Sequence, residues 1–398
     1  MIQNALKTSF IFLAFLFAFS CTSKIENTNY LVEELEAIQK EFAPDKRVAL
    51  LAIDVEKIEN TYVLKGESNL PDAIEAFKNN LNKANISFID SIQLLPSSAL
   101  NNTILGLVTI SVANLRSNPK HSAELATQAT LGTPVKIYKN DGSWSLIQTP
   151  DKYLSWVDNA GITPMTPNDF ENWKARPKII YTNIFGSTYS APDQKSQVVS
   201  DIVAGGILTL LGEESNFYKA EYPDGRIAYI NKTEAEVYKA WLAETNPSEE
   251  NLVATSKQLM GLPYLWGGTS TKGVDCSGYT KTIYFLNGII LPRDASQQIH
   301  TGELIDESED FKNLRPGDLL FFGKKATDTS AERVIHVGMW IGNNEFIHSS
   351  GQVRVSSVDK NAANFDAYNL NRYLRTKRVV NSTTGAFINL SKTPVFTN

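Results

Sequence analysis

The chain has 398 residues, of which 42% are hydrophobic, and a formal net charge of −5 at pH 7. This length predicts two to four domains. A mildly acidic chain has no general attraction to nucleic acid, so we expect no nucleic-acid partner. Two cysteines and four histidines make a four-coordinate structural zinc site very improbable, and we expect neither a metal nor another cofactor.

Residues 1–21 have the pattern of an export leader. Lys7 precedes an apolar run from Ser9 to Phe19, which is too short to cross a bilayer. The end of the run resembles the lipid-attachment motif of bacterial lipoproteins, although bulky Phe19 departs from it. We therefore expect lipidation at Cys21 and an exported, membrane-anchored lipoprotein, periplasmic or at the cell surface; the alternative is a plain signal peptide with a chance cysteine.

A tether and a small α/β region are expected over residues 22–100. Apolar residues at helical spacing predict a helix near its start. The remaining patterns predict strands at 48–55, 62–64 and 86–95 and a helix at 71–84.

An internal repeat follows. Pro119 and Pro192 are 73 residues apart, and each is followed by a glycine 13 residues on and aromatic residues 25 and 37 residues on. Short strands separated by turns such as Asn140-Asp-Gly indicate two small β-barrels. The layout resembles two bacterial SH3-like domains, at about 101–165 and 175–235.

The last domain is expected over residues 245–380. A helix at 247–262 begins with Ser248 as its cap, and a second helix begins at Cys276. Strands follow at 318–322, 334–341 and 345–348. This order, with the cysteine-bearing helix before the histidine-bearing sheet, is the papain-like arrangement.

Cys276 is either a nucleophile or a bystander, because a lipidated Cys21 leaves no disulfide in the mature chain. It lies in Asp275-Cys-Ser-Gly278, where a loop turns into a helix. A helix N-terminus and a nearby imidazolium both favour the thiolate. The Cys276 amide can point at a developing oxyanion, which contributes about 3 kcal/mol per donor, and Gly278 allows another backbone to approach closely.

Two of the histidines follow Cys276 on a predicted hairpin. Alternation places Val334, His336, Gly338 and Trp340 on one face, and Ile335, Val337, Met339 and Ile341 on a buried face. With a three-residue turn at 342–344, His336 and His348 share a face and lie diagonally, about 7–8 Å apart. A two-residue turn would place them on opposite faces. On one face, His348 would orient His336 and fix its tautomer.

These segments together resemble the NlpC/P60 family of cysteine peptidases over about 245–380. The matching motifs are Tyr264-Leu-Trp-Gly-Gly, Asp275-Cys-Ser-Gly, Leu291-Pro-Arg-Asp-Ala-Ser296, Arg315-Pro-Gly-Asp-Leu319, His336-Val-Gly and Phe346-Ile-His348. The resemblance implies Cys276 as nucleophile, His336 as base, His348 as the third polar residue and Tyr264 as a hydroxyl donor near the oxyanion. His121 and His300 match no catalytic position and are expected at the surface, and Trp266 is expected to pack within its loop.

Two SH3-like domains ahead of such a peptidase resemble the γ-D-glutamyl-L-diamino acid endopeptidases and the dipeptidyl-peptidase VI group. The resemblance implies cleavage of murein stem peptides that have a free N-terminal L-alanine, whose ammonium is held by an aspartate, a tyrosine and a glutamate. Asp294 matches the aspartate, and Tyr153 and Glu124 are our candidates for the other two. Asp275 and Ser277 are also assigned to substrate binding. The structural alternatives are a solvated charge for Glu124, and for Asp294 a helix cap or a salt bridge to Arg293.

The sequence thus predicts an α+β multi-domain protein, with two small SH3-like β-barrels, a papain-like catalytic domain and a small N-terminal α/β unit, and we expect a monomer. Two other functions stay open. One is an amidase or acyltransferase of the same fold, which a broad cleft without the ammonium-binding residues would favour. The other is a non-catalytic lipoprotein that binds cell wall. Diaminopimelate and lysine both fit the third position of the peptide.

Overall fold

The computed structural model describes residues 22–59 and 61–398, so the predicted leader and the lipidation site at Cys21 lie outside the described residues. The chain forms two compact units. One comprises the residues up to Lys46 together with Leu50–Leu94, and the other comprises Arg47–Ala49 with Leu95–Asn398. Within the described ranges, we find no helix with the length and apolar character needed to cross a membrane.

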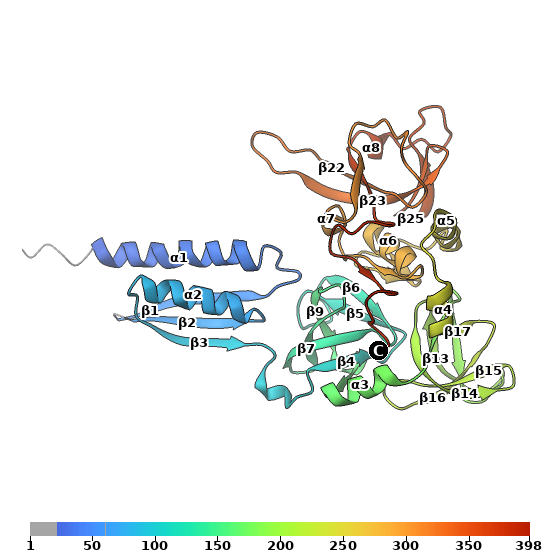
Figure 1. Cartoon of the computed structure of the whole chain (residues 1–398), viewed down its shortest axis with the longest axis horizontal. Helices are drawn as coiled ribbons and strands as arrows, with labels where there is room; N and C mark the ends of the chain where they lie inside the picture. Colours follow the sequence, from blue (N-terminus) through green and yellow to red (C-terminus); the bar gives the residue numbers. More distant parts are fainter. Residues whose placement is uncertain (1–21, 60) are drawn as a thin grey trace, which may run out of the picture. The chain divides into compact units, whose positions relative to one another are not determined.

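The smaller unit is the expected α/β structure. Its three-stranded sheet has the order β1-β2-β3, with β1 antiparallel to β2 and β2 parallel to β3. The crossover helix α2 starts at Pro71, a position where the missing N–H is no loss, and packs beside α1 (Figure 1). The elements are α1 (Thr22–Phe42), β1 (Leu51–Ile58), β2 (Thr61–Ser68), α2 (Pro71–Lys83) and β3 (Phe88–Leu94).

The larger unit begins with two seven-stranded sheets of identical topology. The first has the order β10-β4-β7-β8-β9-β5-β6, and the second, read from its other edge, has the equivalent order β17-β11-β14-β15-β16-β12-β13. Trp144 opens β8 as Phe217 opens β15, and both side chains are buried. The first aromatic position of each repeat therefore serves as core, whereas the second, Trp156 and Tyr229, is half-buried. The strands are β4 (Leu105–Val108), β5 (Val112–Arg116), β6 (Leu125–Thr130), β7 (Pro134–Asp141), β8 (Trp144–Gln148), β9 (Leu154–Asp158), β10 (Ile162–Met165), β11 (Lys178–Tyr181), β12 (Phe185–Tyr189), β13 (Val198–Val203), β14 (Ile207–Glu214), β15 (Phe217–Glu221), β16 (Ile227–Asn231) and β17 (Ala235–Val237).

Connecting helices and the C-terminal tail share an apolar cluster. Trp173 of α3 (Pro167–Ala175) and Trp241 of α4 (Tyr238–Glu244) pack with Leu390 and Phe396 of the tail. The tail also adds a strand, β27 (Ile388–Asn389), to β20 (Ile289–Ile290). The residues after 380, to which the sequence assigns no role, are thus packed into the structure.

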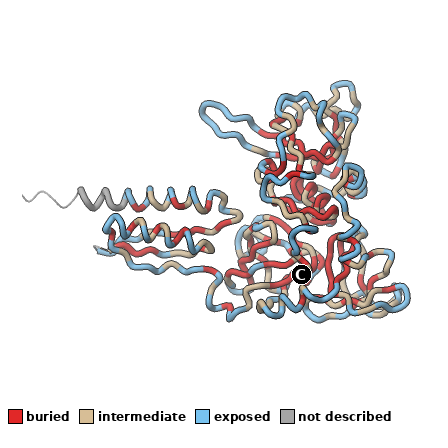
Figure 2. The backbone as a smooth tube through the Cα atoms, in the orientation of Figure 1, coloured by how far each residue is buried: buried red, intermediate tan, exposed pale blue. Residues whose placement is uncertain are grey.

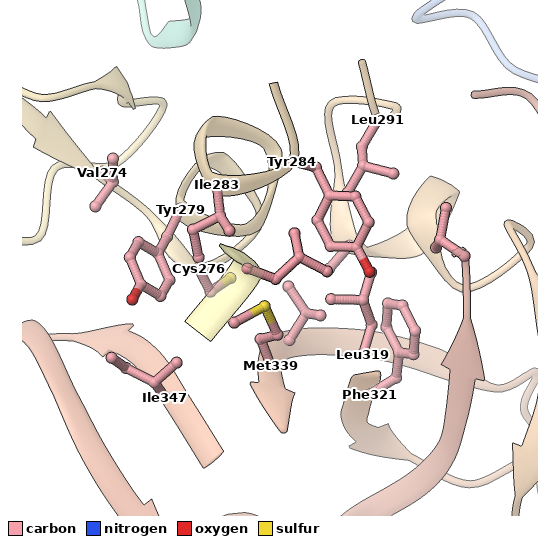
Figure 3. Close-up of a cluster of buried hydrophobic side chains, with 14 of the residues drawn as sticks. Val274, Cys276, Tyr279, Ile283, Tyr284, Leu291, Leu319, Phe321, Met339 and Ile347 are labelled. Carbon is pink, nitrogen blue, oxygen red and sulfur yellow. The ribbon is translucent and has the colours of Figure 1, made fainter. Parts of the chain in front are cut away.

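The last part of the chain is a six-stranded sheet with helices packed on it, in the order β21-β26-β22-β23-β24-β25. Helix α6 is buried along most of its length (Figure 2), and Ser248 caps α5 as expected. Figure 3 shows side chains of α6, such as Tyr279 and Ile283, packed with Met339 and Ile347 of the sheet. The elements are α5 (Glu249–Gln258), β18 (Thr269–Ser270), β19 (Gly273–Val274), α6 (Cys276–Phe285), α7 (Ala295–Gln298), β21 (Glu303–Asp306), β22 (Leu319–Lys324), β23 (Arg333–Gly342), β24 (Glu345–Ser350), β25 (Gln352–Ser357), α8 (Ala367–Leu370) and β26 (Tyr373–Arg378).

Candidate active site

Cys276 is the first residue of α6, and its side chain lies among the buried side chains between the helix and the sheet (Figure 3). Asp275 caps the helix, because its Oδ1 accepts the Gly278 N–H at 2.7 Å. A Cβ on Gly278 would lie 1.9 Å from the Gly268 carbonyl oxygen. The backbone of the preceding loop therefore approaches the helix start as closely as a glycine permits, as the sequence predicts.

The two histidines meet on the sheet. His336 Nε2 and His348 Nδ1 are 2.7 Å apart, and His348 Nε2 lies 3.0 Å from the Ser356 hydroxyl oxygen. The Asp366 carboxylate lies 3.9 Å from the same nitrogen. This chain of contacts fixes the His336 ring and its tautomer, as a third catalytic-site residue does.

The hairpin reaches this geometry by a route that the sequence analysis did not foresee. Gly342 pairs with Glu345, so the turn has two residues, Asn343 and Asn344, both with positive φ. A bulge between Trp340 and Gly342 adds the residue that the turn lacks. The expectation of a three-residue turn is therefore wrong, but the bulge restores the diagonal placement of His336 and His348.

A second bulge corrects the predicted buried face of β23. The register against β22 shifts between Val334 and His336. Ile335 consequently points outward and is 42% exposed, whereas Val334 is partly buried and packs against the hydrophobic core. Val337 and Met339 are fully buried, as predicted.

Burial controls the protonation of the reacting groups. Burial, followed by the Asp275 carboxylate, raises the pKa of the Cys276 thiol to about 11, although the Val337 and Ser277 N–H groups act in the opposite direction. Burial and the neighbouring His348 lower the pKa of His336 well below 6.5. Both shifts favour a neutral thiol and a neutral imidazole in the unliganded protein, whereas the sequence analysis predicted a thiolate stabilised by an imidazolium.

Tyr264 lies beside the nucleophile. Burial, then the charges of Cys276 and Asp275, raise the pKa of its hydroxyl to about 12. The phenol therefore stays protonated at neutral pH and can donate a hydrogen bond, which is what the predicted oxyanion donor requires.

A buried ion pair supports the Cys276 loop. Arg293, which is 1% exposed, donates to both Asp275 carboxylate oxygens, at 3.2 and 2.6 Å, and to the Ser277 hydroxyl at 3.0 Å. Asp275 Oδ2 also accepts the Gly267 N–H at 3.0 Å. The side chains of Asp275 and Ser277 thus hold the Cys276 loop in position. Both residues also line the cleft of Cys276, so their role in substrate binding stays a prediction.

Cys276 and His336 line a cleft of ≈ 450 Å³, and residues of the first SH3-like sheet line it as well. Tyr153, the residue before β9 of that sheet, donates from its hydroxyl to Asp294 Oδ2 at 3.1 Å. Glu124 lines the same cleft. The structure therefore gathers the three predicted ammonium-binding residues around one cleft. Asp294 also caps α7 and lies 3.9 Å from Arg293. The helix cap and the salt bridge that the sequence offered as structural alternatives are therefore both present.

The sequence analysis missed three cleft residues. Trp266, expected to pack within its loop, is 63% exposed and donates from Nε1 to Glu124 at 2.7 Å. Arg47 and Arg333 also line the cleft. No motif lies near Arg47, whereas Arg333 lies three residues before His336, whose strand pattern could have drawn attention to it. Arg47 Nη1 lies 2.7 Å from Asp294 Oδ2 and 2.8 Å from the Ser296 hydroxyl.

The remaining histidines are at the surface, as expected. The His121 side chain is 79% exposed, near Asp158, and His300 is exposed. Across residues 22–59 and 61–398, no three His, Cys, Asp or Glu side chains are grouped so that they could hold a metal ion.

Comparison with known proteins identifies the family. The NlpC/P60 family matches residues 261–370, and the bacterial dipeptidyl-peptidase SH3 domain matches residues 115–162. A γ-D-glutamyl-L-lysine dipeptidyl-peptidase of Bacillus cereus is 32% identical over 234 residues, which cover 57% of this chain and 67% of the relative. The chain belongs to the NlpC/P60 family. The cleft that contains Cys276 and His336 is therefore the candidate active site of this NlpC/P60 peptidase.

Two further relatives agree with this NlpC/P60 assignment. Dipeptidyl-peptidase 6 of Lysinibacillus sphaericus is 27% identical, over 64% of this chain and 92% of its own length. The crystal structure of an NlpC/P60 family protein from Bacillus cereus has a TM-score of 0.60 and 25% identity, and the match covers 69% of this chain and 99% of that chain.

An NlpC/P60 endopeptidase from Photobacterium damselae subsp. piscicida has a similar fold. Its TM-score is 0.55 at 17% identity, with coverage of 88% of this chain and 84% of that chain.

Proposed function

We propose that this NlpC/P60 peptidase cleaves the γ-D-glutamyl-L-diamino acid bond of murein stem peptides whose N-terminal L-alanine is free. The main support for this proposal is the hydrogen bond between Tyr153, from the first SH3-like domain, and Asp294. Both residues line the cleft that also contains Cys276. The Bacillus cereus and Lysinibacillus sphaericus relatives are named as dipeptidyl-peptidases, which supports the same substrate class.

The end of the cleft has the chemistry that an ammonium requires. Asp294 and Glu124 supply carboxylate oxygens, and the buried Tyr153 hydroxyl supplies a further polar contact. Burial and the Asp294 charge raise the pKa of Tyr153 above its ordinary value, which keeps this hydroxyl protonated. A desolvated ammonium without acceptors would be costly, so a cleft lined by two carboxylates favours a free amine over an acylated one.

Hydrolysis then follows the usual two steps of a cysteine peptidase. The Cys276 sulfur attacks the γ-carbonyl carbon while His336 takes the thiol proton. The oxyanion lies near the Cys276 N–H and the Tyr264 hydroxyl. Collapse of the intermediate breaks the C–N bond as His336 protonates the leaving amine, and water, activated by His336, then releases the dipeptide from sulfur.

We also propose that the protein acts as a monomer and, through a lipid on Cys21, at a membrane of the exported compartment. Its role would be the turnover of released peptides instead of the cutting of intact wall, where the alanine nitrogen is part of an amide bond.

The test compares L-Ala-γ-D-Glu-diaminopimelate with the same tripeptide acetylated on its alanine nitrogen. We expect kcat/KM to be at least about tenfold higher for the free peptide, since hydrogen bonds to charged groups typically contribute 1.5–3 kcal/mol. Asp294→Asn should raise KM for the free peptide and reduce the difference in kcat/KM between the free and the acetylated peptide. Hydrolysis of intact murein at the rate of the free tripeptide would refute the proposal.

A further inference from the structure

The Arg47 guanidinium pairs with the Asp294 carboxylate, which the proposed function assigns to the substrate ammonium. Arg47 Nη1 lies 2.7 Å from Asp294 Oδ2, the same oxygen that accepts from the Tyr153 hydroxyl. Arg47 also donates to the Ser296 hydroxyl at 2.8 Å. The guanidinium thus lies within the active-site cleft, at the end that the proposed function assigns to the alanine amine.

The backbone around Arg47 is fixed to the first SH3-like sheet. The Arg47 carbonyl accepts the Leu154 N–H at 2.7 Å, and the Val48 carbonyl accepts Nε2 of Gln148 at 3.0 Å. Arg47, Val48 and Ala49 belong to the same compact unit as the cleft. These bonds place the Arg47 backbone beside Tyr153, so the side chain has a short and defined path to Asp294.

The Arg47 side chain itself is less confined. Its exposed fraction is 37%, and that of Asp294 is 27%. A partly exposed ion pair is weaker than a buried one, because the charges are screened and holding two side chains in one geometry costs entropy. The guanidinium already borders solvent, so it can move away from Asp294 and Ser296 while its backbone stays in place.

An ammonium and a guanidinium compete for this site. Both would take Asp294 Oδ2 as an acceptor, and two cations at hydrogen-bonding distance from one oxygen repel each other. The Glu124 carboxylate, bonded to the neutral Trp266 N–H, is the second acceptor available to the substrate.

We propose that Arg47 is an internal competitor of the substrate ammonium, so that it sets how strongly the enzyme prefers a free N-terminus. This inference rests on the proposed function. In the unliganded enzyme, Arg47 pairs with Asp294; binding of a free alanine amine displaces it into solvent. An acetylated peptide has no cation to offer Asp294 and leaves Arg47 where it is.

The test measures KM for the free and acetylated tripeptides in Arg47→Gln and Arg47→Lys. Arg47→Gln removes the charge but keeps a polar stem, and we expect KM for the free peptide to fall between about twofold and tenfold. Its KM for the acetylated peptide should not change. Arg47→Lys keeps a competing cation and should lie between the wild type and Arg47→Gln. Lys46→Gln, which removes an exposed charge one residue away, should change neither constant.

A binding measurement separates the inference from catalysis. In the Cys276→Ala background, calorimetry should give a lower Kd for L-Ala-γ-D-Glu when Arg47→Gln is added, and an unchanged Kd for its acetylated form. A rise in KM or Kd for the free peptide, or equal changes for both peptides, would overturn the role of Arg47. If the wild type prefers the free peptide and Arg47→Gln does not alter the ratio of KM values for the two peptides, only this inference fails. If the wild type shows no discrimination, the proposed ammonium site itself fails.

Discussion

At the scale of single residues, the candidate active site favours the neutral forms of Cys276 and His336. Apolar surroundings raise the pKa of Cys276 and lower that of His336, since both charged forms lose solvation on burial. His348, with its pKa lowered to about 4 mainly by burial, also stays neutral. Proton transfer from sulfur to His336 then accompanies attack on the carbonyl carbon.

These shifts predict a broad pH profile. Because the pKa of His336 lies well below 6.5, kcat at saturating tripeptide should hold as pH falls through 6.5 and decline only under more acidic conditions. Because the pKa of Cys276 is raised from 9.0 to about 11, the alkaline decline should begin only above pH 9.0. The alkylation rate of Cys276 by iodoacetamide should rise through the same alkaline range. A reactive thiolate already present at pH 6, with kcat falling between pH 6 and 8, would show that an imidazolium–thiolate pair exists in the free enzyme.

Substitutions at the three catalytic positions should have graded effects on cleavage of the free tripeptide. Cys276→Ala removes the nucleophile and should lower kcat by more than about 10³-fold, with His336→Ala nearly as severe. His348→Ala removes only the group that orients His336, and it should lower kcat by between about tenfold and 10³-fold. Circular dichroism spectra should match the wild type in each case. Wild-type activity of Cys276→Ala would rule out the mechanism.

At the scale of elements, two β-bulges and one helix start place these residues. The bulge between Trp340 and Gly342 corrects the register of the hairpin, and the bulge near Ile335 turns that side chain outward. On the other side, α6 starts at Cys276 because Asp275 caps it and the loop before it lies against Gly278. The placement of the cysteine and the histidines thus depends on the backbone of these elements as well as on side-chain contacts.

Gly278→Ala tests the close approach of the loop to α6. The added methyl group would meet the Gly268 carbonyl oxygen at 1.9 Å, and neither backbone can move without shifting Cys276. We expect a loss of about 1–3 kcal/mol in the free energy of unfolding, as for other overpacked sites, together with a large fall in kcat. Gly212→Ala is the matched control, because a Cβ there meets nothing within 4 Å. Equal thermal stability of the two variants would contradict this reading of the helix start.

At the scale of the whole molecule, the first SH3-like sheet is joined to the peptidase by polar contacts beside the cleft. Gln128 of β6 accepts the Thr269 N–H at 3.1 Å and the Ser270 hydroxyl at 2.9 Å. Below them, Lys281 of α6 pairs with Asp151, and the two side chains are only 15% and 5% exposed. These contacts hold Glu124 and Tyr153 in position over a cleft whose nucleophile is more than 120 residues further along the chain.

Lys281→Met should weaken this junction. The substitution leaves the Asp151 carboxylate buried without its counter-charge, and breaking such a pair typically costs about 3–5 kcal/mol. We expect a clear drop in Tm and a raised KM for the free tripeptide, because Tyr153 lies two residues from Asp151. Lys232→Met, which breaks an ion pair with Glu213 that is 27% and 54% exposed, should change Tm little. A Tm for Lys281→Met as high as that of the control would mean that the buried pair does not stabilise the junction.

Local pattern was sufficient for much of this protein. A cap, a glycine and a cysteine in four consecutive residues predict the start of α6, and the 73-residue repeat predicts two equivalent sheets, because both signals lie within short stretches of chain. The hairpin register was less accessible, since a bulge adds one residue without any clear mark in the sequence. Only the tertiary structure decided the protonation of Cys276 and His336, which depends on burial by distant side chains. Only the tertiary structure also showed that Arg47 contacts Asp294, 247 residues away in the sequence. A contact between distant parts of the chain leaves no periodicity or motif from which it could be predicted.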